Sequence, residues 1–309
     1  MKIITLTLSP AYDVHCKANK ITPGEENFIT LVERNAGGKG INISRALNSF
    51  GVNTCAVTVL GEENCQEYVA SAKNEGISLE KILVPGRIRE NITIHTDDGE
   101  ETRISFSAEE IPSGILQSVR EITAGLSNGD ILTFTGSIPR GVSIQDAKEY
   151  IKELKARGVF VIVDSRSLSL SDIAEIKPYF IKPNKLEAEN YLGRKIVGEG
   201  DACDAARELR ATGAENVMLT LGADGAVLAT ANSCDFSRAP TLSAVSTIGA
   251  GDSAIAGFIY ADLLGLSKRD ALSYSIAFGS AACLRSGTKP PDKSDVQRIL
   301  EELKQKPAL

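Results

Sequence analysis

A glycine-rich stretch before an apolar segment groups the most reactive residue types of the sequence. Gly249, Ala250, Gly251 and Asp252 stand directly ahead of the mostly apolar run 253–261. The pattern predicts a helix beginning here, whose first amides have no carbonyl partner and favour an anion. These amides would hold charge developing on a transferring phosphoryl group, while Asp252 deprotonates an alcohol. From this stretch alone, it is equally consistent that Asp252 only stabilises the first turn of the helix through its interaction with the helix dipole.

Two better-known glycine patterns do not describe the chain. Residues 249–254 match GxGxxG/A, the dinucleotide-binding pattern, but Asp252 would then face the pyrophosphate with a like charge. Residues 33–40 resemble a P-loop, yet Glu33 stands at its first glycine position and Gly40 at the position of the magnesium-binding hydroxyl. Neither pattern holds, and a dinucleotide-dependent oxidoreductase is disfavoured.

A second glycine cluster, "NAGGKGINIS", also has residue types suited to a ligand. Gly37 and Gly38 permit close backbone approach, Lys39 offers a mobile positive charge, and Asn42 begins a helix near that point. The alternative is a glycine turn before an amphipathic helix with a solvated lysine. Taken alone, the cluster slightly favours that alternative.

Two further motifs allow both a structural and a functional interpretation. Asn184 and Glu187 in "KPNKLEAENYLG" have the spacing of a helix capping box. The same amide and carboxylate would suit a hydrated magnesium ion beside phosphates. "TLGADG", residues 220–225, is either a turn between strands or a nucleotide-contacting loop.

The composition excludes several classes of protein. The 309 residues allow one large α/β domain or two small ones, and the net charge of -6 argues against binding to nucleic acid or an anionic membrane. Six scattered cysteines without a CxxC pair indicate buried free thiols in a reducing cytoplasm. The first residues read as a strand rather than a signal peptide, and no apolar run is long enough to span a membrane. We therefore expect a cytoplasmic protein.

Strand-like and helix-like runs alternate over most of the chain, which predicts parallel strands with crossover helices on both faces. "DILTFTG" and "GVFVIVDS" have the continuous apolar character of buried strands, and the part after Gly251 reads as mostly helical. Two segments, about 11–34 and 86–106, instead alternate as half-exposed antiparallel strands. They predict a small sheet standing off a single domain as a lid.

Seven segments in this order give the chain a resemblance to a known family. They are "SPAYD", "GGKGINISRAL", "RENITI", "TGSIPRG", "KPNKLEAE", "TLGADG" and "STIGAGDSAIAGF". Together they resemble the PfkB family of carbohydrate kinases, and the resemblance covers nearly the whole chain. It implies a ribokinase-like α/β fold, a three-layer α/β/α sandwich with a mostly parallel central sheet and a small β-sheet lid.

The resemblance also implies ATP-dependent phosphorylation of a sugar alcohol with magnesium, and it leaves a monovalent cation as a further candidate cofactor. Asp252 matches the catalytic base, in a segment with Gly249, Ala250 and Gly251. The remaining matches are sugar-side Asp13, Gly38, Lys39 and Asn42, nucleotide-side Lys182, Asn184, Thr220, Gly222 and Gly225, and Asn184 with Glu187 as the water-mediated magnesium motif. In many members the lid mediates dimerisation, so a homodimer through the lid is expected.

"GGKGINISRAL" and "RENITI" most resemble the branch that acts on sugars already carrying a phosphate. Arg89 and Arg103 would supply planar forks for that phosphate, supported by Lys39; Arg103 equally suits a solvated strand position. Ser9 replaces the Asn common before Pro in this branch, and "TRISFSAEE" departs from the pattern common in 1-phosphofructokinases. The sequence therefore predicts a kinase of a ketohexose phosphate.

The preferred substrate is fructose 1-phosphate, converted to fructose 1,6-bisphosphate. Tagatose-6-phosphate kinase and 6-phosphofructokinase activity of the same family are the alternatives. From another class, the alternative is a sugar-phosphate sensor that binds without turnover; a sensor has no need of the intact Asp252.

Overall fold

Nine strands form one large sheet within residues 1–107 and 110–305, which the computed structural model describes. Their order is β13-β12-β11-β10-β9-β8-β1-β4-β5; all neighbours from β5 to β11 pair in parallel, and β12 and β13 add antiparallel pairs. The strands are β1 (Ile3–Thr7), β4 (Cys55–Gly61), β5 (Ser78–Val84), β8 (Ile131–Thr135), β9 (Phe160–Asp164), β10 (Phe180–Ile181), β11 (Asn216–Thr220), β12 (Ala226–Ala229) and β13 (Cys234–Ser237).

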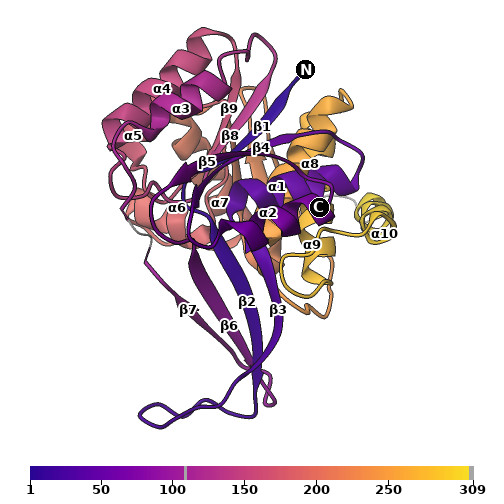
Figure 1. The fold of residues 1–309 in the computed structure, drawn as a ribbon. Helices are drawn as coiled ribbons and strands as arrows, with labels where there is room; N and C mark the ends of the chain where they lie inside the picture. The colour runs from indigo at the N-terminus through magenta and orange to yellow at the C-terminus, as the bar shows by residue number, and fades with distance from the viewer. Residues whose placement is uncertain (108–109, 306–309) are drawn as a thin grey trace.

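Helices cover both faces of this sheet (Figure 1). One layer contains α1 (Lys39–Ser49), α2 (Cys65–Asn74), α8 (Ala250–Leu263), α9 (Lys268–Cys283) and α10 (Lys293–Gln305). The other contains α3 (Ile115–Ile122), α4 (Ile144–Ala156), α5 (Leu170–Ile176), α6 (Lys185–Leu192) and α7 (Gly198–Ala211). Successive strand residues alternate between the layers: Ile3 belongs to the α8 and α9 core, and Ile4 to the α3 and α4 core. The expected three-layer ribokinase-like α/β architecture is confirmed.

The structure contains the buried strands and the helical C-terminal part that the apolar runs predict. All five residues of β8 are buried, as are the last four of β9, because helices cover both faces of these strands. After Gly251 the regular elements are α8, α9 and α10. None of the helices in the described ranges is long and apolar enough to cross a membrane.

A separate four-stranded sheet, which we call the lid, stands off the large sheet (Figure 1). Its order is β3-β2-β6-β7, with β2 (Ala11–Ala18), β3 (Thr30–Gly37), β6 (Arg89–Thr96) and β7 (Glu101–Ser105). The expectation of antiparallel strands is wrong for the central pair, because β2 and β6 are parallel. Each follows a parallel strand of the large sheet, β1 or β5, so both leave it in the same direction and return through β3 and β7.

The lid has one polar and one apolar face. Odd-numbered positions such as Asp13, Asn91 and Arg103 share the polar face, because β2, β6 and β7 are in register there. Even-numbered Tyr12 and Ile94 belong to an apolar cluster. Large apolar side chains remain exposed on or beside the lid: Phe28, Ile29, Leu31, Val32, Ile104 and Phe106.

The six cysteines are free thiols. Cys16 and Cys65 are buried, whereas Cys55, Cys203, Cys234 and Cys283 are only partly buried, so the expectation of buried thiols is wrong for these four. Cys203 and Cys234 lie with their Sγ atoms 2.9 Å apart, between α7 and β13.

Candidate active site

The carboxyl ends of β9 and β10 meet the amino ends of α1 and α8 at one point. Asp164 ends β9, Lys182 follows β10, Lys39 begins α1, and Asp252 lies in the first turn of α8. Such ends of parallel strands are where open α/β sheets bind ligands. The structure therefore joins two glycine-rich stretches that are about two hundred residues apart in the sequence, at Lys39 and Asp252.

Asp252 is a buried carboxylate at the start of a helix. Its side chain accepts a hydrogen bond of 2.8 Å at Oδ2 from Nδ2 of Asn42, and the residue is 7% exposed. Burial raises the pKa of Asp252 to about 6; Lys39 and the Asn42 hydrogen bond oppose that rise. A carboxylate of this kind is ionised near neutral pH and still basic enough to take a proton.

Gly249 lets α8 begin at this point. It adopts the left-handed conformation with φ of 76°, and Ala250 and Gly251 follow as the first helical residues. A Cβ atom on Gly251 would lie 3.0 Å from the Lys182 ammonium, so the glycine leaves that cation against the helix start. Two sources of positive potential, the helix amides and Lys182, therefore face the same space.

Asp164 holds two lysines at this centre. Its Oδ2 lies 2.9 Å from Lys39 Nζ and 3.6 Å from Lys182 Nζ. Burial raises the pKa of Asp164, but the two ammonium groups outweigh burial and hold it below its usual value. For Lys39 burial lowers the pKa, and Asp164 and Asp252 together raise it above the usual value, so both partners stay charged. Asp164 is not among the residues predicted from the sequence, although an aspartate that ends an apolar strand is a usable signal.

The sugar-side candidates come from three places: the polar face of the lid (Asp13, Arg89 and Arg103), the glycine turn beside it (Gly38), and the start of α1 (Lys39 and Asn42). Asn91 links two of them: its Nδ2 donates to Asp13 Oδ1 at 3.0 Å, and its Oδ1 accepts from Arg89 Nη1 at 3.0 Å. Arg103 Nη2 is 3.9 Å from the same Asp13 oxygen, and its side chain is 45% exposed. Asn91 is not among the residues predicted from the sequence, although it lies two residues after Arg89 and therefore on the same strand face.

The glycine turn connects the lid to α1. A Cβ atom on Gly37 would overlap the Asp13 carboxylate, and one on Gly38 would lie 2.7 Å from Thr7 Cγ2. Gly38 also has φ of 131°, a conformation that side-chain-bearing residues rarely adopt. Glycine at these two positions thus brings Asp13 and the end of β1 up to the start of α1.

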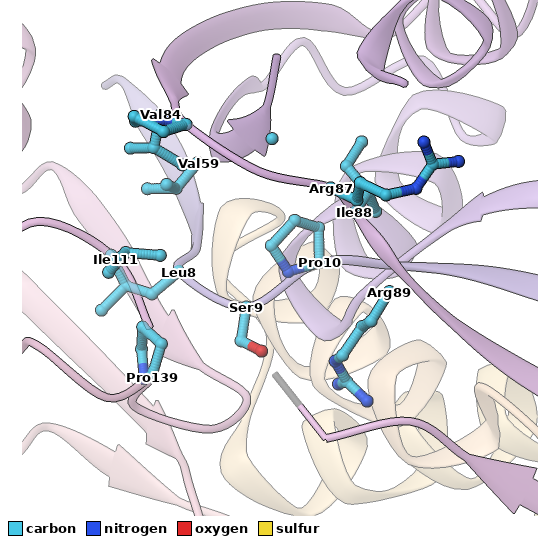
Figure 2. A pocket seen from close by; sticks show the side chains of 12 residues that line it. Leu8, Ser9, Pro10, Val59, Val84, Arg87, Ile88, Arg89, Ile111 and Pro139 are labelled. Atoms are coloured by element: carbon cyan, nitrogen blue, oxygen red, sulfur yellow. The ribbon is translucent and has the colours of Figure 1, made fainter. Parts of the chain in front are cut away.

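A hollow of about 380 Å³, partly open to solvent, lies where β1 and β5 pass into the lid. Figure 2 shows Arg89 and Ser9 extending to the same side of Pro10, while the Arg87 guanidinium points the other way. Arg89 Nε and Ser9 Oγ are both buried without a hydrogen-bond partner in the structure. Burial lowers the pKa of Arg89. A buried donor on a desolvated cation suits an anionic ligand.

The nucleotide-side candidates form a second group around α6. Asn184 and Glu187 make the predicted capping box in full, with Asn184 accepting from the Glu187 amide and Glu187 from the Asn184 amide. Glu187 Oε1 also accepts from Arg166 Nε at 2.6 Å. Thr220 pairs with Asn184 as an isolated parallel bridge, which places the end of β11 beside this cap.

Gly222 and Gly225 shape the loop after β11. Both have positive φ, 65° and 112°, and Gly222 has open space at its Cβ position. A Cβ atom on Gly225 would overlap the Ser237 carbonyl, so glycine is required there. A small hollow next to α6 is lined in part by Asp164, Lys182 and Glu187, and thus connects this group with the centre.

The donor set agrees with magnesium held by outer contacts. Residues 1–107 and 110–305 contain no group of three or more His, Cys, Asp or Glu side chains able to hold a metal ion. Magnesium beside phosphates keeps several waters and needs only one or two carboxylates. Glu187 and Asn184 satisfy each other, so they fit such an ion through water rather than as direct ligands.

Comparisons with known proteins agree on one family. The model of the pfkB family carbohydrate kinases matches residues 6–295. The 1-phosphofructokinase of Haemophilus influenzae is 32% identical over 97% of this chain and 97% of its own. That of Escherichia coli K12 is 30% identical over 99% and 98%.

A solved structure extends the match to three dimensions. Phosphofructokinase-2 from Escherichia coli, in complex with substrates and products, superposes with a TM-score of 0.93 at 27% identity, covering 98% of this chain and all of the other. Other structures of that protein are described as a potassium complex and as a tetrameric inhibited form.

Proposed function

Because the chain belongs to the pfkB family of carbohydrate kinases, we propose that it transfers the γ-phosphoryl group of ATP to a hydroxyl of a ketohexose phosphate. Fructose 1-phosphate is the proposed acceptor and fructose 1,6-bisphosphate the product. The observation that carries the proposal is the buried Asp252 at the start of α8, held by Asn42 and facing two lysines. The full-length similarity to two 1-phosphofructokinases supports this acceptor.

Asp252 acts as the general base in this proposal. Its carboxylate takes the proton of the acceptor hydroxyl as the oxygen attacks phosphorus. The hydrogen bond from Asn42 fixes one carboxylate oxygen and leaves the other for the hydroxyl. With a pKa of about 6, the base is mostly ionised at pH 7 and is a stronger base than an exposed aspartate.

The amides at the start of α8 and the Lys182 ammonium stabilise the phosphoryl group in transit. They are in place before reaction, because Gly251 packs on Lys182 and Asp164 holds both Lys182 and Lys39. When bound, magnesium supplies further charge neutralisation of the ATP phosphates. Asn184 and Glu187 would hold its water shell, and Thr220, Gly222 and Gly225 would contact the nucleotide. A monovalent cation is a further proposed cofactor, in line with the potassium complex of the structural relative.

Asp13 and Asn42 would bind sugar hydroxyls, with Gly38 and Lys39 beside them. Arg89 would bind the substrate phosphate through the Nε and Nη2 groups of its guanidinium, and Arg103 would add a weaker contact. The unpartnered Nε of Arg89 and its closeness to Asp13 through Asn91 support this assignment.

The direct test is ADP release with magnesium-ATP on a panel of acceptors. We expect turnover to be highest with fructose 1-phosphate, lower with tagatose 6-phosphate, and at least tenfold lower with fructose and ribose. Preference for an unphosphorylated sugar would contradict the phosphate role of Arg89. Binding of a sugar phosphate without turnover of any sugar would replace the kinase by a sensor.

Fructose 6-phosphate is the second candidate acceptor. The observation in its favour is the TM-score of 0.93 to phosphofructokinase-2 from Escherichia coli, which another structure describes in complex with fructose-6-phosphate. The same panel separates the two, since the ratio of kcat/KM for the two fructose phosphates gives the preference directly.

We further propose that residues 1–309 form a single domain with a lid built from about 11–34 and 86–106. The lids of two copies would pair to form a homodimer. The protein would act in the cytoplasm, where ATP and sugar phosphates are found. The exposed Leu31, Val32 and Ile104 would form the contact. Leu31→Asp should convert a dimer to a monomer in light scattering after gel filtration, whereas Leu264→Asp, at an exposed site at the end of α8 and away from the lid, should not. A wild-type monomer at micromolar concentration would rule out the dimer.

A further inference from the structure

Arg45 is a buried arginine beside the proposed base, and it has no part in the function described so far. It is 4% exposed and lies on α1, one turn after Asn42. Its Nη1 donates to Asn42 Oδ1 at 2.7 Å, and its Nη2 donates to the Ala36 carbonyl at 2.6 Å. The Glu75 carboxylate, at the end of α2, pairs with Nε and with Nη2.

The chemistry of these groups fixes which way the Asn42 amide points. Arginine has only donors, so the amide edge that faces Arg45 must be the carbonyl oxygen. The opposite edge, the NH₂ group, therefore faces Asp252, where Nδ2 lies 2.8 Å from Oδ2. Without Arg45 the amide is free to turn its oxygen toward water or toward the carboxylate.

We propose that Arg45 is a positioning residue for the phosphoryl-transfer reaction, which holds Asn42 as a donor to the base and so keeps Asp252 ionised and oriented. It touches neither substrate nor Asp252 itself, and acts through the Asn42 amide. The inference rests on the proposed function for its kinetic consequences, but the orientation of the amide does not depend on the substrate.

The electrostatic effect has a definite sign. A donor on a carboxylate stabilises the ionised form, and an acceptor turned toward it destabilises that form. The Asn42 hydrogen bond already opposes the rise in the pKa of Asp252 that burial causes. Loss of the donor should therefore move the titration of Asp252 to higher pH.

The same guanidinium also contacts backbone on both sides of the centre. Ala36 directly precedes the turn of Gly37 and Gly38, and the Thr288 carbonyl accepts from Nη1 at 3.5 Å. A Cβ atom on Gly249 would lie 3.8 Å from Thr288, so this loop is packed beside the start of α8. Arg45 thus joins the two glycine segments as well as orienting the amide.

Glu75 serves a different purpose from Asn42 in this set. A buried guanidinium needs a counter-charge, and Glu75 supplies it from a half-buried site where Ser71 Oγ also donates to it at 3.1 Å. Glu75→Gln keeps an acceptor for Arg45 but weakens the charge balance. It should lower stability with little effect on the amide, which makes it the control for a purely structural role.

The test follows the Asp252 carboxyl by carbon-13 NMR of protein labelled at aspartate, with the signal assigned by its absence in Asp252→Asn. Wild type should titrate near pH 6, whereas Arg45→Met should titrate about one pH unit higher and Arg45→Lys in between. Glu75→Gln should titrate within about 0.3 unit of wild type while its Tm falls. The acid limb of the kcat profile should shift with the NMR titration, with KM for ATP within about threefold.

Each result decides between the two roles. If Arg45→Lys and Arg45→Met lower Tm but leave the Asp252 titration unchanged, Arg45 is only structural and the inference fails. Should Arg45→Met not fold, Arg45→Lys is compared in the Asn42→Ala background, where it should no longer shift the titration; an equal shift there would also overturn the inference. Absence of kinase activity in wild type would refute the proposed function, and the NMR titration would still test Arg45.

Discussion

The two halves of the candidate site are built differently. At the large sheet, Asp252 lies 2.8 Å from Asn42, and Asp164 lies 2.9 Å from Lys39 and 3.6 Å from Lys182. Most of these residues are buried. On the lid, Arg103 is 3.9 Å from Asp13 and nearly half exposed, and Arg89 keeps a buried Nε without a partner. Short contacts within the protein thus fix the groups on the large sheet, whereas the lid groups have longer or missing contacts.

This difference indicates which groups need a substrate to complete them. The transfer half is preorganised, because its cations and its base are fixed by contacts within the protein. On the lid, Arg89 is partly desolvated and its Nε has no hydrogen-bond partner. A phosphate should therefore bind more strongly to Arg89 than to a solvated arginine. Substitutions in the two halves should therefore have effects of different size and kind.

Loss of the base should have the largest effect. Asp252→Asn should reduce turnover by about 10²–10⁴-fold, the usual contribution of a positioned general base, with sugar-phosphate binding nearly intact. Single-turnover kinetics with magnesium-ATP measures the chemical step directly. Asp262, at the far end of α8, accepts hydrogen bonds from Tyr179 and Lys268. Asp262→Asn is the matched control, and its turnover should stay within about threefold of wild type. Turnover like that of wild type in Asp252→Asn would remove it from the base role.

Loss of the phosphate fork should have an intermediate effect. Arg89→Met should lower kcat/KM for the sugar phosphate by about 10–100-fold, and Arg103→Met by less, because a charge-assisted hydrogen bond at a buried site is the stronger. The effect should appear mainly in KM. Arg87→Met is the neighbouring control, since its guanidinium points away in Figure 2. Equal losses in Arg87→Met and Arg89→Met would show that general charge, rather than a fork, attracts the substrate.

The smallest effect is on the stability of Asp252→Asn. This substitution should increase stability, although it decreases turnover. The raised pKa of Asp252 means that its contribution to stability is complete below about pH 4 and is lost as the pH rises through about 6. Asp252→Asn avoids that loss and should be more stable at pH 8 by up to about 3 kcal/mol, which corresponds to a few degrees in Tm. The gain should shrink toward pH 5.

Asp130→Asn provides the contrast for this measurement. Its carboxylate accepts hydrogen bonds from the Lys2 amide at 2.6 Å and the Ser127 amide at 2.9 Å, so its removal should destabilise the protein at pH 8. A loss of stability in Asp252→Asn at pH 8 would contradict the prediction, because it would mean that the ionised Asp252 does not destabilise the folded protein.

The sequence was most informative where a residue type has only one physical use. Glycine before an apolar run, as at Gly249, and the Asn184 to Glu187 spacing predicted helix starts that the structure contains. Apolar runs predicted the buried strands for the same reason. These signals are local, so neighbouring residues suffice to read them.

Asp164, Asn91 and Arg45 were missed because each has at least one essential partner remote in sequence: Lys39 for Asp164, Asp13 for Asn91 and Glu75 for Arg45. Arg45 on a helix and Asn91 on a strand read as ordinary polar positions until Asn42, Glu75, Asp13 and Arg89 are placed around them. The parallel pairing of β2 with β6 was also missed, because alternation gives the exposed face of a strand but not the direction of its neighbour.

That parallel pairing has a mechanical consequence. The short stretches 8–10 and 85–88 lead from β1 and β5 into the lid, where β2 and β6 pair from Ala11 and Arg89 onward, and the glycine turn joins β3 to α1 as a further connection. Because Ala11 pairs with Arg89 and Asp13 with Asn91, the pairing holds Asp13 and Arg89 in one fixed arrangement, so both should meet a sugar phosphate together.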